Sequence, residues 1–141
     1  MERKASAVWL GGLKEGKGAV STASGVLSEA PYSFLTRFEQ RVGTNPEELL
    51  AAAHASCFAM ALSFELGKVG ITPRKLEAAA TVTIDMVQDQ FVITKSHIDL
   101  VAHIPHAEKM AFEAAVRAAQ VGCPVSKLFK AEITVSAKLV S

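Results

Sequence analysis

Two cysteines are the residues of this chain with the most reactive side chains, and they stand in different settings. Cys57 lies in the middle of a long apolar stretch, where a free cysteine often serves as a small buried hydrophobe. Cys123 follows Gly122 and precedes Pro124, a pattern typical of a new helix, whose first N–H groups favour a thiolate. An inert packing role remains open for Cys57, and a plain turn role remains open for Cys123.

A pair of thiols in an otherwise cysteine-free chain suggests redox chemistry. A thiol that reduces a peroxide needs three things: a thiolate, a nearby cation to hold it, and a second thiol to convert the sulfenic acid into a disulfide. Arginine suits the cation best, because it stays charged and presents a fork of donors. Arg37 is our first choice, with a solvated surface arginine as its alternative. Spacing does not exclude the other arginines, Arg3, Arg41, Arg74 and Arg117.

A long helix is expected to carry Cys57. Asn45 is a good N-cap and Pro46 suits the first helical position, so the helix should begin there and run to about Gly67. From Leu49 to Leu66 it is apolar nearly all the way round. Such a helix is normally buried on all sides, which in a small chain calls for a sheet wrapped around it or a second subunit.

The other elements follow from alternation and turn residues. Strands are expected at 5–10, 19–23 and 32–38 (the last carrying Arg37), a loop at 24–31, a hairpin of 77–87 with 91–104, a helix at 107–121, and a strand at 131–139. The strict alternation of 131–139 is typical of a half-buried antiparallel strand. Strands and helices do not alternate one for one, which predicts a single α+β domain over residues 1–141.

Composition excludes several classes of protein. Fifteen basic and 14 acidic side chains give a formal charge of +1, without the basic excess of a nucleic-acid binder. Four polar residues (His54, Ser56, Ser63 and Glu65) interrupt the most apolar stretch, which argues against a membrane span. No apolar segment of signal-peptide length follows the N-terminus, so a soluble, cytoplasmic protein is expected.

Two segments carry a family resemblance. Thr44–Leu62 (TNPEELLAAAHASCFAMAL) closely resembles the cysteine helix of the OsmC/Ohr family, named after osmotically inducible protein C and organic hydroperoxide resistance protein. Gly122–Ser126 (GCPVS) resembles the second cysteine segment of that family. The similarity runs from the opening hairpin to the last strand, and His54 is more similar to the OsmC branch.

The resemblance implies a thiol-dependent peroxidase that uses no metal and no bound cofactor. Cys57 would be the peroxidatic cysteine, Cys123 the resolving cysteine, Arg37 the catalytic arginine and Glu47 its partner. Organic or lipid hydroperoxides would be reduced to alcohols through a Cys57 sulfenic acid and a Cys57–Cys123 disulfide, in defence against oxidative and osmotic stress. Electrons would come from a small dithiol or a lipoylated protein.

The resemblance also implies an intertwined homodimer, with antiparallel sheets wrapped around long central helices and active sites at the subunit interface. Helix geometry fits this expectation. Glu47 and Cys57 lie ten residues apart on one predicted helix, so about 15 Å separates them along its axis. Arg37 and Glu47 are therefore expected to serve Cys57 of the partner subunit, while Glu48 caps the helix. Apolar residues are expected near the site, namely Phe34, Phe38, Phe58, Met60 and Phe64.

Two other classes stay open. A metal protein would use His54, Cys57, Cys123 and another histidine, although no Cys-x-x-Cys pair accompanies them. A non-enzymatic dimeric protein would bind a lipid-like ligand in an apolar cavity and use its cysteines for packing. For His54 itself, a satisfied polar group in the core is favoured over a contact with the thiolate or the substrate.

Overall fold

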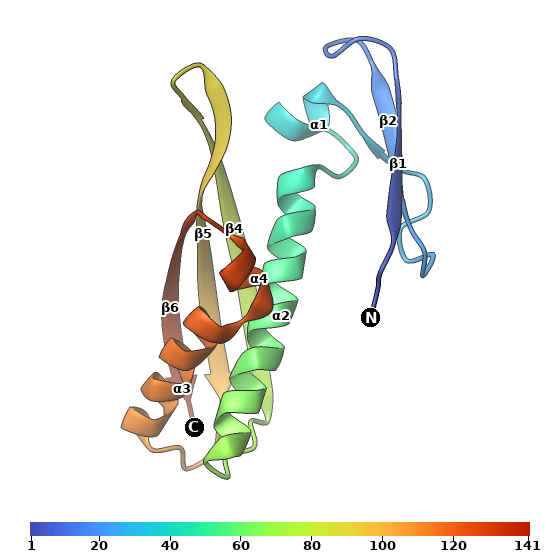
Figure 1. The fold of residues 1–141 in the computed structure, drawn as a ribbon. Helices are drawn as coiled ribbons and strands as arrows, with labels where there is room; N and C mark the ends of the chain where they lie inside the picture. Colours follow the sequence, from blue (N-terminus) through green and yellow to red (C-terminus); the bar gives the residue numbers. More distant parts are fainter. The chain divides into compact units, whose positions relative to one another are not determined.

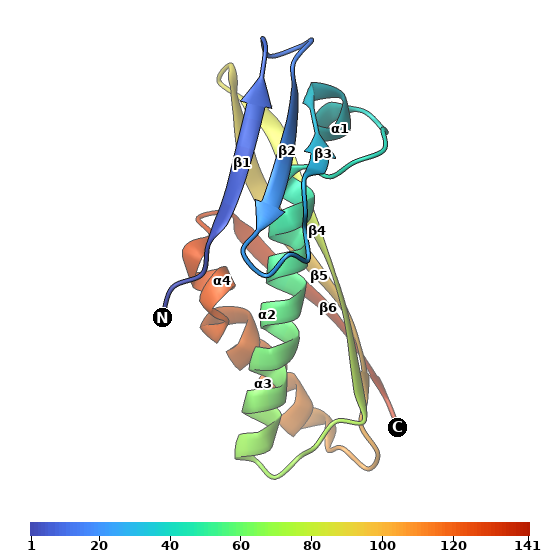
Figure 2. The ribbon, with the colours of Figure 1, turned by 90° about the vertical axis from the view of Figure 1, so that its right-hand side faces the viewer.

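The computed structural model describes residues 1–141, which divide into two compact units, 1–49 and 50–141. The first unit holds a three-stranded sheet in the order β1 (Ala5–Leu10), β2 (Lys17–Thr22) and β3 (Ala30–Tyr32). Both strand pairs are antiparallel, and Figure 2 shows the three strands side by side. The short helix α1 (Phe34–Phe38) follows β3 directly.

The prediction of a strand over 32–38 is wrong, because a capping box ends β3 and starts α1. The Ser33 side chain accepts a hydrogen bond from Thr36 N at 3.2 Å, and Ser33 N donates to Thr36 Oγ1 at 2.7 Å. These reciprocal bonds satisfy donors that a helix start leaves open. Arg37 therefore projects from a helix, and the strand falls at 30–32, across the boundary between the expected loop and the expected strand.

The long helix α2 (Pro46–Lys68) is confirmed at the expected place. Glu48 N donates to Asn45 Oδ1 at 2.8 Å, which is the expected N-cap bond, and Thr44 Oγ1 donates to the Glu48 carboxylate at 2.8 Å. Glu48 thus belongs to the helix start, as expected.

The second unit contains most of α2 and a sheet in the order β4 (Lys75–Val87), β5 (Gln90–His103) and β6 (Glu132–Val140). Helices α3 (Lys109–Gly122) and α4 (Pro124–Leu128) connect β5 to β6. β4 and β5 form the expected antiparallel hairpin, but β6 pairs with β5 in parallel. The antiparallel prediction for β6 is wrong because alternation reports burial of one face. The crossover through two helices sets the strand's direction.

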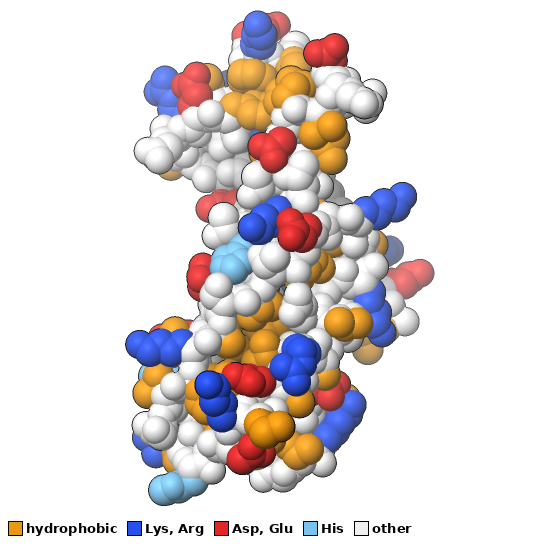
Figure 3. Space-filling model, turned by 90° about the vertical axis from the view of Figure 1, so that its left-hand side faces the viewer, with side chains coloured by type: hydrophobic (Ala, Val, Ile, Leu, Met, Phe, Trp, Pro, Cys, Tyr) orange, Lys and Arg blue, Asp and Glu red, His pale blue; other side chains and the backbone are white.

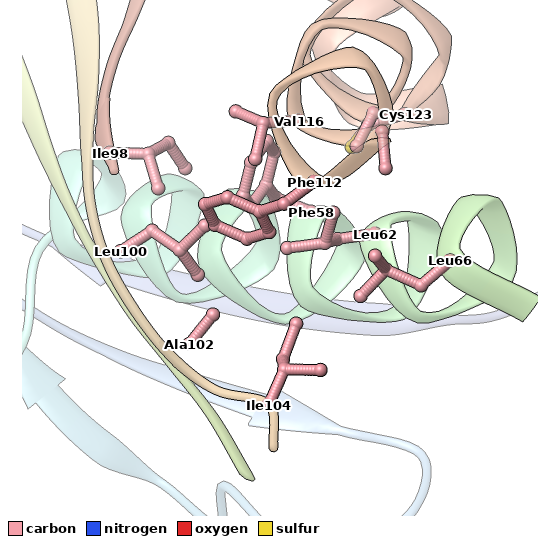
Figure 4. Packing of buried hydrophobic residues seen from close by; sticks show 12 residues of the cluster. Phe58, Leu62, Leu66, Ile98, Leu100, Ala102, Ile104, Phe112, Val116 and Cys123 are labelled. Carbon is pink, nitrogen blue, oxygen red and sulfur yellow. The ribbon is translucent and has the colours of Figure 1, made fainter. Parts of the chain in front are cut away.

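One face of this sheet carries the core of the second unit (Figures 1 and 4). Alternate residues of β5 (Ile98, Leu100 and Ala102) face residues of α2 and α3, and all are buried. From α2 come Phe58, Leu62 and Leu66, which recur every four residues and share one side of the helix. The α+β class with a long central helix is therefore confirmed.

Within the second unit, the sheet and α3 cover only one side of α2. Met60 and Phe64, on the same helix, keep 75% and 66% of their surface exposed. The sheet alone therefore does not provide the all-round burial that the apolar sequence requires, which leaves the second subunit as the other means of covering this helix.

The four polar residues of the apolar stretch do not by themselves exclude a membrane span for α2. An 18-residue window of α2 has a mean hydropathy of 1.5, so by length and composition alone the helix could cross a membrane. The four polar residues leave the mean hydropathy of α2 high enough for a membrane-spanning helix. The core helix of a soluble protein passes the same test, and α2 supplies three residues to the core described above.

Charged side chains of both signs are interspersed on the face shown in Figure 3. Lysines and arginines alternate there with acidic side chains, and hydrophobic side chains show between them. This distribution matches the near-neutral charge of the sequence.

Leu62→Ala should lower the free energy of unfolding by about 2–5 kcal/mol, because it opens a cavity between α2 and the sheet. Val26→Ala is the control, since Val26 is 84% exposed, and a change of at most about 0.5 kcal/mol is expected there. Urea denaturation at one fixed protein concentration measures both. Equal effects of the two substitutions would contradict the core assignment.

Candidate active site

The two cysteine side chains meet in the second unit. Cys57 lies on α2. Cys123 joins two helices, because it is both the C-cap of α3 and the N-cap of α4. Cys123 N donates to Ala119 O at 3.0 Å, and Cys123 O accepts from Lys127 N at 3.0 Å. Pro124 occupies the first helical position, as the sequence predicts. The Cys57 and Cys123 side chains are both free thiols, and they lie close enough to influence each other.

The surroundings of the two thiols differ. Cys57 is partly exposed, whereas Cys123 is completely buried. Burial raises the pKa of the Cys57 thiol, and the hydrogen bond with Cys123 raises it further. A hydrogen bond with the Val125 backbone acts in the opposite direction. In this environment, Cys57 favours the thiol over the reactive thiolate.

A hollow of about 330 Å³ opens beside Cys57. Met60 and Phe64 line it, as expected, together with small residues of α3 such as Ala118 and Gly122. Phe58 does not line it: its side chain is fully buried against the sheet, so the expectation that it faces the site is wrong. An apolar recess next to a thiol can receive the alkyl part of a small molecule.

His54 lies one helical turn before Cys57 and is completely buried. Its Nδ1 is 2.6 Å from Ser96 Oγ on β5, and its Nε2 is 2.8 Å from Ser126 Oγ on α4. Burial lowers its pKa, so the ring is neutral near pH 7. His54 is thus the satisfied core polar group that was favoured. Both ring nitrogens are engaged, and no group of three or more His, Cys, Asp or Glu residues could hold a metal ion.

Ser96 and Ser126 were not expected from the sequence as partners of His54. Ser96 occupies an inward position of β5, in phase with Ile98 and Leu100. A serine in phase with an apolar row is a signal that a buried polar partner lies opposite. Ser126 carries no comparable signal, because the pattern of a five-residue helix is too short to assign a face.

Arg37 and Glu47 form an ion pair within the first unit. Arg37 Nη2 is 2.7 Å from Glu47 Oε1, and Arg37 Nε lies 3.1 and 3.3 Å from the two carboxylate oxygens. The Glu47 side chain is 8% exposed and that of Arg37 is 38% exposed. The bonds use Nε and Nη2, so the Nη1 nitrogen of Arg37 is not engaged by Glu47. A fork held in this way has a fixed orientation.

A second hollow, of about 300 Å³, lies beside Arg37 in the first unit. Phe34 and Phe38 line it, as expected, and the Trp9 and Tyr32 rings, with centroids 5.5 Å apart, form another part of its wall. Arg37 is the only charged residue among those that line this hollow. The recess therefore combines apolar walls with one cation.

These features define a class of protein: an α+β chain in which a long helix presents one partly exposed thiol in contact with a second, buried thiol. The model of the OsmC-like protein family matches residues 38–138. The chain belongs to the OsmC family, as the resemblance implied.

Individual relatives agree with this assignment. The chain is 48% identical over 141 residues to peroxiredoxin OsmC of Escherichia coli (strain K12), covering 100% of this chain and 99% of that protein. The organic hydroperoxide resistance protein OhrB of Bacillus subtilis is 25% identical, with a TM-score of 0.68 over 96% of this chain and 97% of that structure. An OsmC-like protein from Mycoplasma pneumoniae shares the fold, with 16% identity and a TM-score of 0.77 over 100% and 99% of the two chains.

Iodoacetamide should alkylate Cys57 at least about tenfold faster than Cys123 in the native protein, because only Cys57 is exposed. Peptide mass spectrometry after timed quenching measures the two rates. In urea, where neither thiol is buried, the rates should converge. Equal rates in the native protein would contradict the difference in burial.

Proposed function

We propose that this protein reduces organic hydroperoxides with Cys57 as the attacking thiol and Cys123 as the resolving thiol. As an OsmC family member that is 48% identical to a peroxiredoxin along its whole length, it is a thiol peroxidase. The assignment to particular residues is carried by one observation, the closeness of the two free thiols on α2 and at the start of α4. Of the two, only Cys57 is open to a substrate.

The proposed cycle has three steps. The Cys57 thiolate attacks the terminal oxygen of the hydroperoxide, the O–O bond breaks, and the alkoxide leaves as an alcohol after taking up a proton. Cys57 is then a sulfenic acid. The Cys123 sulfur attacks the Cys57 sulfur, an S–S bond forms, and water leaves with the oxygen and the thiol proton. An external dithiol reduces the disulfide and restores both thiols.

We propose that Arg37 of the partner subunit supplies the cation that Cys57 requires. Burial and the neighbouring thiol raise the Cys57 pKa, so a cation must offset these effects during the attack. Glu47 fixes the guanidinium and leaves Nη1 unengaged by the pair. Because α2 is continuous from Pro46 to Lys68, Glu47 and Cys57 stay ten residues apart on one rod. This separation supports service in trans within a homodimer.

The exposed side of α2 supports the same dimer. Met60 and Phe64 are apolar, exposed and next to Cys57, so a second copy placed there would bury them and complete the site. Active sites would then lie at the subunit interface. A cytoplasmic location and a small dithiol or lipoylated protein as reductant complete this proposal.

Organic rather than inorganic peroxides fit the two hollows best. Each is lined mainly by apolar side chains, and each adjoins one of the proposed reactive groups, Arg37 in one and Cys57 in the other. Alkyl or lipid chains gain free energy by leaving water for such walls, whereas hydrogen peroxide has no apolar part to bury. A role in oxidative and osmotic stress defence is consistent with this substrate class.

Cys123→Ser should complete one round of peroxide reduction and then accumulate over-oxidised Cys57, while Cys57→Ser should have no turnover. The test adds one equivalent of cumene hydroperoxide to reduced protein and follows intact mass and free thiols. Wild type should lose two hydrogens and both thiols without forming a cross-linked dimer. Unchanged thiols in wild type would favour the binding protein with packing cysteines.

A heterodimer of one Cys57→Ser chain with one Arg37→Ala chain should recover about half of the wild-type activity, although each homodimer is inactive. Only the trans arrangement pairs the remaining Cys57 with the remaining Arg37. Two affinity tags isolate the heterodimer after co-expression, and cumene hydroperoxide consumption gives the rate. A control heterodimer that replaces Arg41 instead should behave in the same way whether arginine acts in cis or in trans. Activity at the background level in the first heterodimer would show that Arg37 acts in cis.

A further inference from the structure

The hydrogen bonds of His54 connect three elements that surround the thiol pair. His54 lies on α2 three residues before Cys57, Ser96 lies on β5, and Ser126 lies on α4 three residues after Cys123. The imidazole thus bridges the helix that carries one thiol and the helix that begins at the other. All three side chains are at least 94% buried.

The connection to α4 is short and direct. Cys123 O accepts the bond from Lys127 N at 3.0 Å, which closes the single turn of α4 that also contains Ser126. The ring of Phe129, the residue that caps the end of α4, packs edge-on against the His54 ring at 5.1 Å. His54 therefore contacts α4 within its turn and at its end. A shift of α4 relative to α2 must break or stretch the His54–Ser126 bond.

A role in holding α2, β5 and α4 together explains these contacts better than a role in stability or in substrate binding. A buried imidazole and two buried hydroxyls contribute little hydrophobic stabilisation, and each would be costly if its partner were removed. A neutral imidazole has one donor and one acceptor, and each hydroxyl can play either role, so both tautomers are satisfied. The ring does not face the hollow beside Cys57, whose lining excludes it. What the three groups do is fix one arrangement of α2, β5 and α4.

We propose that His54, through Ser126, is a positioning residue for the resolving step: it holds α4, and with it Cys123, against Cys57. This inference rests on the proposed function. In that step the Cys123 sulfur must reach the sulfur of the Cys57 sulfenic acid, form the S–S bond and release water. Misplacement of a reacting group by about 1 Å can cost about 100-fold in rate. The first step, attack on the peroxide, does not use the Cys123 sulfur, and α4 contributes to it only through the Val125 backbone hydrogen bond to Cys57.

The test compares Ser126→Ala with Ser96→Ala. Each removes one buried hydroxyl that bonds His54, so each leaves the same ring with one partner. Only Ser126→Ala releases α4. Rapid mixing with cumene hydroperoxide, acid quenching and intact mass give the amounts of sulfenic, disulfide and sulfinic protein over time, with and without dimedone as a sulfenic-acid trap.

In Ser126→Ala, we expect disulfide formation to slow by about 10- to 100-fold, with a much smaller change in the rate of sulfenic-acid formation and a larger sulfinic fraction. In Ser96→Ala, disulfide formation should stay within about twofold of wild type, although the loss of unfolding free energy is similar. Ser126→Thr, which keeps a hydroxyl, should restore the rate. A purely structural role would slow both steps in each variant in proportion to lost stability.

Several outcomes separate the two proposals. If wild type forms no Cys57–Cys123 disulfide, the proposed function fails. If wild type does and Ser126→Ala resolves at the wild-type rate, only the positioning role fails. Equal slowing in Ser96→Ala would also overturn it. Should Ser126→Ala not fold, His54→Gln is used, because glutamine cannot span both hydroxyls. Resolution is expected to slow much more than sulfenic-acid formation there, and a wild-type resolving rate would overturn the role.

Discussion

The site depends on the rigidity of one helix. An α-helix fixes each residue at a set rise and rotation, so α2 determines how far Glu47, His54 and Cys57 can be from one another. Its sequence makes this rod apolar on most sides, and the sheet covers only one of them. Two consequences follow from the same helix. The thiol lies at the edge of the core with an uncovered apolar surface beside it, and Glu47 in the first helical turn is about 15 Å from it along the axis.

The surroundings of Cys57 suppress its reactivity. Desolvation and the second thiol keep it protonated, and a protonated thiol is a poor nucleophile. The Arg37–Glu47 ion pair of the first unit offers what Cys57 lacks, which is a cation. The buried Glu47 carboxylate holds the Arg37 guanidinium in place. In the proposed dimer, the site would become reactive only when both parts are assembled. Assembly of the dimer would then control the chemistry, and an isolated chain would keep an unreactive thiol.

Much of this could be predicted from the sequence because local rules were sufficient. Asn45 and Pro46 mark the start of α2, and the Cys123–Pro124 step marks the start of α4. Local rules failed where long-range contacts decide the outcome. The alternation in β6 gives burial but not strand direction, and the apolar residues around Cys57 gave no sign that Phe58 faces the sheet. The capping box at Ser33 is a local signal for a helix, but the alternating residues of 32–38 favoured a strand instead. The roles of Ser96 and Ser126 as partners of His54 could be recognised only from their contacts in the structure.

The closeness of the Arg37–Glu47 pair has a consequence for which solutes enter the hollow beside it. The pair as a whole is neutral, because the carboxylate lies 2.7 Å from the guanidinium. A lone arginine at the mouth of an apolar recess would attract chloride, phosphate and carboxylates from solution, and these anions would compete with an uncharged substrate. Because the Glu47 carboxylate balances its charge, Arg37 can still donate hydrogen bonds while the hollow beside it attracts anions less strongly. The buried glutamate would therefore lower the attraction of anions to this hollow as well as orient the arginine.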